Sequence, residues 1–293
     1  MLAPVTEADF GEDAQVEFGL ESLRRYPAFC ADLGVELREA GTLVVARDRD
    51  EAEALDRLHA FRTTLGLEAE RLRPTEARRR EPALAPTVRL ALDVPGDRSV
   101  DPRALVAALR ERVPVTTARV TQILHSDSHR GGTVELATGE RRTAQHLIVA
   151  TGAAGLGLDV VRPVKGQVLR QRDPNRPGLI TRTIRAETTY LVPRADGRYV
   201  LGATVEERGW DATPTAGGVF ELLRDMSEIV PGILEFELEE VNVGFRPGTP
   251  DNQPIIEEID GVIHATGHWR NGILLAPQTA EVVAGLVGAR VPA

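Results

Sequence analysis

Apolar residues recur every three or four positions in several parts of the chain, a spacing that predicts amphipathic helices. The first helix ends at Gly34, and its apolar stripe consists of Val16, Leu20, Leu23, Tyr26, Cys30 and Leu33. A second helix is predicted at 51–65, and a third runs from the helix-start pair Asp101-Pro102 to about 113. That third helix is expected to turn Leu105, Val106 and Leu109 inward.

Two further helices are predicted, one starting at Thr213-Pro214 and one along the C-terminal apolar run that ends near Leu286. The arginine-rich residues 71–80 are interpreted as a solvated helical face. Apolar runs between the helices predict strands at 42–46, 88–94, 115–124, 133–137, 145–150, 190–193, 199–205 and 262–265. The strands at 190–193 and 199–205 flank a turn at 195–198 that contains Asp-Gly.

The strand predicted at 236–246 contains a break in its alternation at Glu239-Glu240, which indicates a β-bulge. Arg246 then lies on the face opposite Phe245, beside Gly244, whose missing side chain is expected to leave space next to the guanidinium. A planar guanidinium with an empty neighbour suits a small carboxylate. The alternative is an exposed arginine at a strand end.

Residues 267–272 form a glycine-bounded turn between the last strand and the last helix. Helix N-termini carry unpaired backbone N–H groups, which attract anionic or electron-rich ligand edges. Arg270 places a cation in this turn. An ordinary strand–turn–helix crossover explains the same spacing equally well.

The net charge of −9 and the lack of a basic tract argue against nucleic acid and anionic membrane surfaces as partners. No apolar run approaches 18 residues and no leader pattern occurs, so a soluble, cytoplasmic protein is expected. Cys30 is the sole cysteine and the six histidines lack ligand spacing, so no metal site is predicted. Lys165 is the only lysine among 35 basic residues. Either its compact ammonium has a role that arginine cannot fill, or a lysine remains at this position by chance in an arginine-rich sequence.

Four stretches in the chain carry a resemblance to a known family. They are Arg-Pro-Val-Lys-Gly-Gln-Val (162–168), Tyr-Leu-Val-Pro-Arg with Leu-Gly-Ala-Thr (190–204), Gly-Phe-Arg-Pro-Gly-Thr (244–249) and His-Trp-Arg-Asn-Gly-Ile-Leu-Leu-Ala-Pro (268–277). In this order they resemble bacterial glycine oxidases of the D-amino-acid oxidase family, over nearly the whole chain. The resemblance implies an FAD-dependent oxidase that uses molecular oxygen. It would convert glycine or a similar small amino acid or amine to the oxo acid, ammonia and hydrogen peroxide, and would serve thiamine thiazole synthesis.

The resemblance also implies roles for individual residues. Arg246 and Tyr190 would hold the substrate carboxylate, and Arg270 would approach the substrate from a flavin-contact segment. Thr188 and Val205 take pocket positions that differ among relatives. The implied FAD contacts are Met1, Leu2, Val120, Ala150, Thr151, Gly152, His268, Trp269, Arg270, Asn271, Gly272, Ile273 and Leu274.

The implied fold is α/β, with a Rossmann-like FAD-binding domain (1–37, 95–174 and 258–293) interleaved with a substrate-binding domain (38–94 and 175–257) built on a mostly antiparallel β-sheet. A Gly-x-Gly-x-x-Gly fingerprint occurs nowhere, so we expect the first βαβ unit to be missing. Either translation begins upstream of Met1, which is then an internal methionine, or the chain is a true gene remnant. The alternative to an active oxidase is therefore an inactive, flavin-free remnant of one. A further alternative is an intact oxidase specific for sarcosine or a D-amino acid. A homo-oligomer is compatible with the glycine oxidase, with the inactive remnant and with this oxidase.

Overall fold

The computed structural model describes residues 1–125, 131–173, 178–194 and 197–288. Its helices are α1 (Asp13–Leu33), α2 (Arg49–Thr64), α3 (Pro74–Arg80), α4 (Pro102–Arg112), α5 (Ala216–Ser227) and α6 (Gly272–Leu286), with short 3-10 helices η1 (Gly152–Ala154) and η3 (Pro231–Glu235). Its strands are β1 (Leu37–Arg38), β2 (Thr42–Ala46), β3 (Glu70–Leu72), β4 (Leu90–Val94), β5 (Ser99–Val100), β6 (Val120–His125), β7 (Gly132–Leu136), β8 (Arg141–Ala144), β9 (Leu147–Val149), β10 (Arg162–Arg172), β11 (Thr183–Arg185), β12 (Tyr190–Pro193), β13 (Arg198–Gly202), β14 (Glu237–Gly248), β15 (Ile255–Ile259) and β16 (Val262–Thr266).

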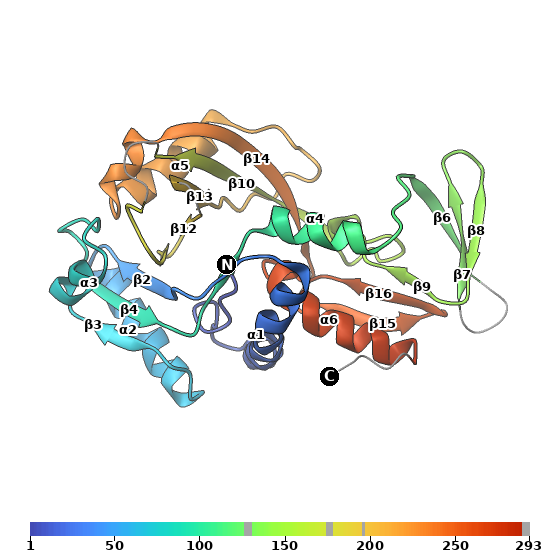
Figure 1. The fold of residues 1–293 in the computed structure, drawn as a ribbon, viewed down its shortest axis with the longest axis horizontal. Helices are drawn as coiled ribbons and strands as arrows, with labels where there is room; N and C mark the ends of the chain where they lie inside the picture. The colour runs from blue at the N-terminus through green and yellow to red at the C-terminus, as the bar shows by residue number, and fades with distance from the viewer. Residues whose placement is uncertain (126–130, 174–177, 195–196, 289–293) are drawn as a thin grey trace.

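One half of the molecule is organised on a large sheet with the strand order β14-β10-β13-β12-β11-β2-β4-β3 (Figure 1). Its strands pair antiparallel except for β11 and β2, which run parallel. The main core packs α5, η3 and α3 on one face of this sheet, and α2 packs against β2 and β4 in a second core. All five residues of β2 and of β4 are therefore buried, and their apolar runs are continuous rather than alternating.

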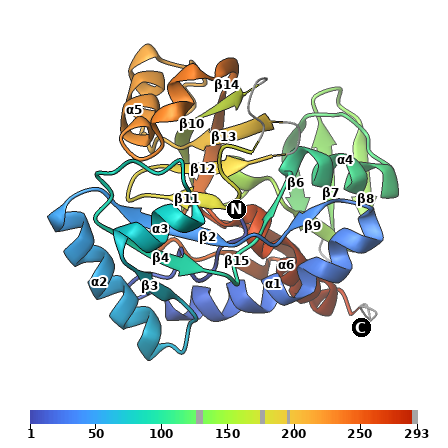
Figure 2. The same ribbon diagram turned by 60° about the vertical axis from the view of Figure 1, so that its left-hand side comes forward.

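The other half holds the chain termini of the described structure and the sheet β15-β16-β9, in which β16 and β9 are parallel (Figure 1). Helix α6 packs on β15 and β16, and α1 lies along α6 (Figure 2). The Ser22 hydroxyl of α1 donates to the carbonyl oxygen of Leu274 in α6 at 2.6 Å, and Tyr26 donates to that of Ile273. The predicted mixed α/β fold with a mostly antiparallel sheet is confirmed.

Several local predictions are confirmed in detail. Gly34 ends α1 with φ +66°, a left-handed conformation that glycine adopts readily. Asp101 caps α4, because its carboxylate accepts the N–H of Arg103 at 2.8 Å. The bulge lies in β14, where the register with β10 shifts so that Glu239 is the extra residue.

Other local predictions are wrong, and tertiary contacts explain why. Arg71 belongs to strand β3 and pairs with Asp56, so the arginine-rich segment 71–80 is not one solvated helix face. Val106 of α4 is 45% exposed, although Leu105 is buried as expected. Helix α5 starts at Ala216 because the Thr215 hydroxyl accepts the N–H of Gly218 at 3.2 Å.

The β-rich middle of the chain differs in extent from the prediction. The strand expected at 115–124 begins only at Val120, and β8 (141–144) was not foreseen. Part of the predicted Asp-Gly turn, residues 195–196, lies outside the described residues. Within the described ranges, each helix is too short or too polar to cross a membrane.

Asp97 is a completely buried carboxyl between β4 and β5. Among the described residues, no donor reaches hydrogen-bonding geometry with either of its carboxylate oxygens. Burial raises the pKa of Asp97 to about 7, because the Thr6 and Thr42 hydroxyls and the Val5 N–H lie close enough to lower the pKa in part but are not aligned as hydrogen-bond donors. The folded protein therefore favours the neutral acid at this position.

We expect Asp97→Asn to gain stability relative to the wild type as the pH rises from about 4 to about 7. In this window the folded wild type keeps a proton that the unfolded chain, with an ordinary aspartate pKa of 3.8, has released. Its free energy of unfolding then falls by at most ~1.4 kcal/mol per pH unit through this group. Asparagine does not titrate, so urea unfolding across this window measures the difference directly. Parallel pH profiles for the two proteins would contradict the raised pKa.

Candidate active site

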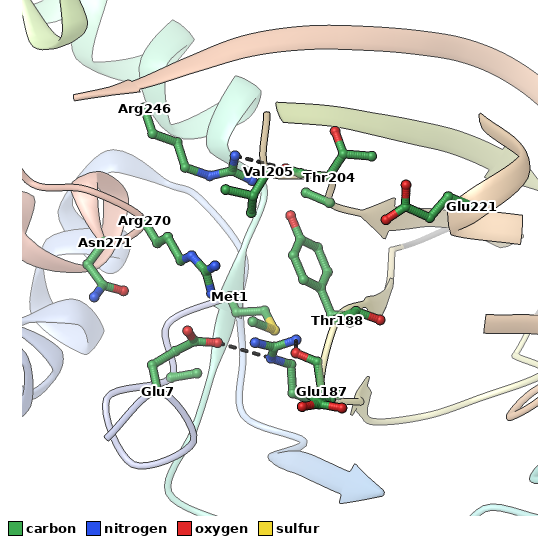
Figure 3. Close-up of a pocket in the computed structure, with 14 residues that line it drawn as sticks. Met1, Glu7, Glu187, Thr188, Thr204, Val205, Glu221, Arg246, Arg270 and Asn271 are labelled. Atoms are coloured by element: carbon green, nitrogen blue, oxygen red, sulfur yellow. Dashed lines mark hydrogen bonds and ion pairs between the residues drawn. The ribbon is translucent and has the colours of Figure 1, made fainter. Parts of the chain in front are cut away.

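A cavity of about 320 Å³ lies where the two halves of the molecule meet (Figure 3). The N-terminal segment, the β11–β12 connection, the end of β13, β14, α5 and the turn before α6 all contribute to its wall. The lining residues are Met1, Ala3, Glu7, Arg185, Glu187, Thr188, Tyr190, Ala203, Thr204, Val205, Glu221, Arg246, Arg270 and Asn271. The cavity thus brings together the three residues predicted for substrate binding, Arg246, Tyr190 and Arg270.

Arg246 projects from β14 into this cavity (Figure 3). Its Nη1 donates to the carbonyl oxygens of Thr204 at 3.0 Å and Lys165 at 3.3 Å. Among the described residues, its Nε and Nη2 donate to no protein group. Burial lowers the pKa of the guanidinium, but arginine keeps its charge near neutral pH. Two aligned donors are therefore left to bind a carboxylate side by side.

The space beside the Arg246 guanidinium comes from a glycine other than the one predicted. A Cβ added at Gly244 would meet no atom within 4 Å. A Cβ added at Gly166, across the sheet on β10, would lie 2.3 Å from Arg246 Nη1. The register pairs Gly166 with Gly244 and Val164 with Arg246, so the guanidinium folds over Gly166. The prediction that Gly244 supplies this space is wrong, because contacts across a sheet follow the register and not the adjacent residue in the sequence.

Tyr190 opens β12 and is accommodated by a glycine in the same way. Its partner in the β12–β13 register is Gly202, and a Cβ there would lie 2.5 Å from the Tyr190 hydroxyl oxygen. Removal from water raises the pKa of Tyr190, against the opposing charge of Arg246. The phenol therefore stays protonated near neutral pH and can donate a hydrogen bond to an anion.

The turn before α6 brings a second cation and a row of donors to the cavity. Arg270 lies over the Trp269 ring, 5.6 Å from its centroid, and among the described residues it makes no hydrogen bond. Asn271 is the N-cap of α6 but its side chain does not cap the helix, so the first N–H groups of α6 stay free of a side-chain partner. His268 bonds through Nε2 to the Thr279 hydroxyl at 2.9 Å, and burial lowers its pKa to about 4. His268 is therefore neutral near pH 7.

The same three residues, Ala-Thr-Gly, stand at the C-terminal ends of two parallel strands. Ala150-Thr151-Gly152 follows β9, and Ala265-Thr266-Gly267 ends β16. The Thr266 hydroxyl donates to the Gly152 carbonyl oxygen at 2.8 Å, which joins the two turns. A Cβ at Gly152 would meet no atom within 4 Å, so a ligand can approach the backbone closely there. Ligands of open α/β sheets bind at this end of the strands.

The family model described as FAD dependent oxidoreductase matches residues 2–286 of the chain. The chain belongs to the FAD-dependent oxidoreductase family. The predicted family and its cofactor, FAD, are thereby confirmed.

Individual members of this family are similar over most of the chain. Glycine oxidase of Bacillus licheniformis is 31% identical over 290 residues, which span 92% of this chain and 77% of that protein. Bifunctional protein ThiO/ThiG of Synechocystis sp. is 36% identical over 205 residues, 66% of this chain and 31% of that protein. The crystal structure of glycine oxidase from Geobacillus kaustophilus matches with a TM-score of 0.90 and 32% identity, covering 100% of this chain and 84% of that one.

The described residues fit one part of the FAD of this oxidoreductase family, the electron-rich edge of its ring system. Arg270 and Asn271 line the cavity and directly precede the free N–H groups of α6, and a helix N-terminus with a cation beside it suits such an edge. The joined Thr-Gly turns offer open backbone to a more distant part of the cofactor.

Other predicted cofactor residues of this family member have different surroundings. Leu2 and Leu274 are buried in the core between α1 and α6, and Ile273 packs against it. Val120 starts β6 and is half-buried, whereas Ala150 and Thr151 are exposed. Of the predicted cofactor contacts, Met1, Arg270 and Asn271 line the cavity. The remaining assignments stay predictions.

An ion pair in the cavity wall was not predicted from the sequence. Glu7 accepts from Arg185 Nε at 3.2 Å, one of the dashed contacts in Figure 3. Both residues also line a neighbouring cavity of about 280 Å³. Neither a turn motif nor a hydrophobic period marks these positions. In the described part of the chain, no group of three or more His, Cys, Asp or Glu residues is arranged to hold a metal ion.

If Tyr190 binds the substrate carboxylate as predicted, Tyr190→Phe should raise KM, measured with glycine as the test substrate, by about two- to tenfold, because one hydrogen bond of ~0.5–1.5 kcal/mol is lost. The ring remains in its space over Gly202, so the fold should be unaffected. Steady-state kinetics measure the effect. Removing the charged Arg246 contact should cost more than removing this neutral hydrogen bond, and a larger loss in Tyr190→Phe would contradict that order.

Proposed function

We propose that the chain is a glycine oxidase, which oxidises glycine or a similarly small amino acid or secondary amine. With water and oxygen as co-reactants, glycine would yield glyoxylate, ammonia and hydrogen peroxide. The observation that carries the proposal is the pair of free donors on Arg246, next to the protonated Tyr190 hydroxyl, in a cavity bordered by the α6 N-terminus. The glycine oxidases among the relatives support it.

In this proposal the side chains act by binding and orientation. Arg246 and Tyr190 hold the substrate carboxylate at two points, which fixes the direction of the substrate Cα–H bond. Arg270 keeps that side of the cavity cationic. FAD, when bound, supplies the redox chemistry, taking two electrons from the substrate and passing them to oxygen. Among the described residues no histidine lines the cavity, so the proposal assigns no histidine as a base.

The likeness to a ThiO/ThiG protein supports a further part of the proposal, that the product enters thiamine thiazole synthesis. We place this activity in the cytoplasm. The alternatives of a sarcosine or D-amino-acid oxidase use the same carboxylate contacts and differ in what lies beside Thr188 and Val205.

The test is an absorption spectrum of the purified protein, followed by peroxide release on adding glycine, sarcosine or D-alanine. Bound flavin with the highest kcat/KM for glycine supports the proposal. A preference for sarcosine or D-alanine would replace it with the corresponding oxidase. A flavin-free protein that releases no peroxide after addition of FAD would support the inactive alternative.

A further inference from the structure

The only lysine of the chain is completely buried next to the candidate active site. Lys165 lies in β10 and has no exposed surface, although the other 34 basic residues are arginines and most of the arginines that the structure describes are exposed. Its ammonium donates to the carbonyl oxygen of Thr213 at 2.7 Å and lies 3.5 Å from carboxylate oxygens of Glu206 and Asp211. A buried charge is tolerated because it has these three acceptors.

Glu206 is the centre of a hydrogen-bond network around the end of β13. Its Oε1 accepts from the Thr204 hydroxyl at 2.7 Å and from Gln167 Nε2 at 2.7 Å. Its Oε2 faces Lys165 and, at 3.4 Å, the guanidinium of Arg208. The same network holds Thr204 and Val205, which line the cavity, in one place.

Lys165 also contacts the candidate substrate arginine through its backbone. Its carbonyl oxygen accepts from Arg246 Nη1, which donates at the same time to the Thr204 carbonyl oxygen. The backbone N–H and C=O of Lys165 bond to those of Glu206 at 3.0 and 2.9 Å. One residue thus joins the guanidinium, the end of β13 and the 211–213 segment.

We propose that Lys165 is a positioning residue for substrate binding: its ammonium, held by Glu206, Asp211 and Thr213, fixes the Thr204 carbonyl that aims Arg246. This inference rests on the proposed function, in which Arg246 binds the carboxylate. It explains why this position is a lysine. A guanidinium is larger and planar, and it cannot direct donors to three acceptors around one buried nitrogen.

The test compares Lys165→Met with the wild type in two independent measurements. Met keeps the apolar stem and removes the charge, so Glu206 and the 211–213 segment lose their shared partner. Hydrogen exchange of residues 203–215 should become faster in the variant, while that of β2 and β4 stays unchanged. The KM for glycine should rise about tenfold, or ~1.4 kcal/mol, with kcat changed by less than about twofold.

Arg208→Met is the matched control, because Arg208 also pairs with Glu206 but is exposed. Its KM should stay within about twofold of the wild type. Lys165→Arg should raise KM as Lys165→Met does, because a planar guanidinium keeps the charge but cannot donate to Glu206, Asp211 and Thr213 from one position. If Lys165→Met does not fold, Glu206→Gln, which keeps the lysine and the shape of its partner, should still raise KM and speed exchange at 203–215.

The inference is overturned if Lys165→Met, or Glu206→Gln where Lys165→Met does not fold, exchanges at 203–215 like the wild type or leaves the KM for glycine unchanged. Hydrogen exchange needs no substrate, so it remains decisive even if the wild type oxidises none of the small amines. In that case the proposed function fails separately, while the structural role of Lys165 is still measured.

Discussion

Replacing Arg246 by alanine is expected to raise the KM for glycine by about 10- to 100-fold, because a charge-assisted contact of ~1.5–3 kcal/mol is lost. The Nε and Nη2 donors are the part of the guanidinium left for a ligand, and alanine removes both. Cofactor binding should persist, because the α6 N-terminus and the joined Thr-Gly turns do not depend on Arg246. Steady-state kinetics, with the flavin spectrum as the control, measure both effects.

Arg246→Lys gives a second measure of the same contact. A lysine keeps the charge but lacks the planar fork, so it should recover only part of the lost affinity. Unchanged kcat/KM in the alanine variant would remove Arg246 from the substrate site.

Gly166→Ala should impair substrate binding nearly as strongly as loss of the arginine, with the fold preserved. The added methyl carbon would lie 2.3 Å from Arg246 Nη1, so the guanidinium has to move. Because the displaced group is the far end of a flexible side chain, stability should change little while KM rises by about tenfold or more. Thermal unfolding and kinetics on the same sample separate the two quantities.

Gly244→Ala is the control for this variant. It is the register partner of Gly166 in the same two strands, yet its added carbon meets no atom within 4 Å. Its KM should match that of the wild type. Equal losses in both variants would show that strand glycines matter in general, and not through the space for Arg246.

Features that depend on near neighbours in the sequence are predictable from the chain alone. The end of α1 at Gly34, the cap at Asp101 and the bulge at Glu239 each follow from a few consecutive residues. The candidate site is predictable only through resemblance, which names Arg246, Tyr190 and Arg270, and the structure does place all three in one cavity.

What the sequence does not reveal depends on pairing between distant strands. Gly166 and Gly202 make room for Arg246 and Tyr190 only because of the β10–β14 and β12–β13 registers. The Glu7–Arg185 pair joins residues far apart in the chain. The sequence predicts Arg71 on a helix surface, but in the structure β3 pairs with β4 and Arg71 lies beside Asp56. A one-residue shift of register would change the contacts of Gly166, Gly202 and Arg71.

The parallel pairing of β2 with β11 has a consequence during synthesis of the chain. Thr42, Leu43 and Val44 pair with Thr183, Ile184 and Arg185, so the ribosome completes β2 roughly 7–30 s before its neighbour, at ~5–20 residues per second. Until β11 is made, β2, whose side chains are all buried in the finished protein, has at least one edge of unpaired backbone N–H and C=O groups. Wrong pairing of β2 with another chain is therefore a hazard of synthesis that ends only when β11 has been made.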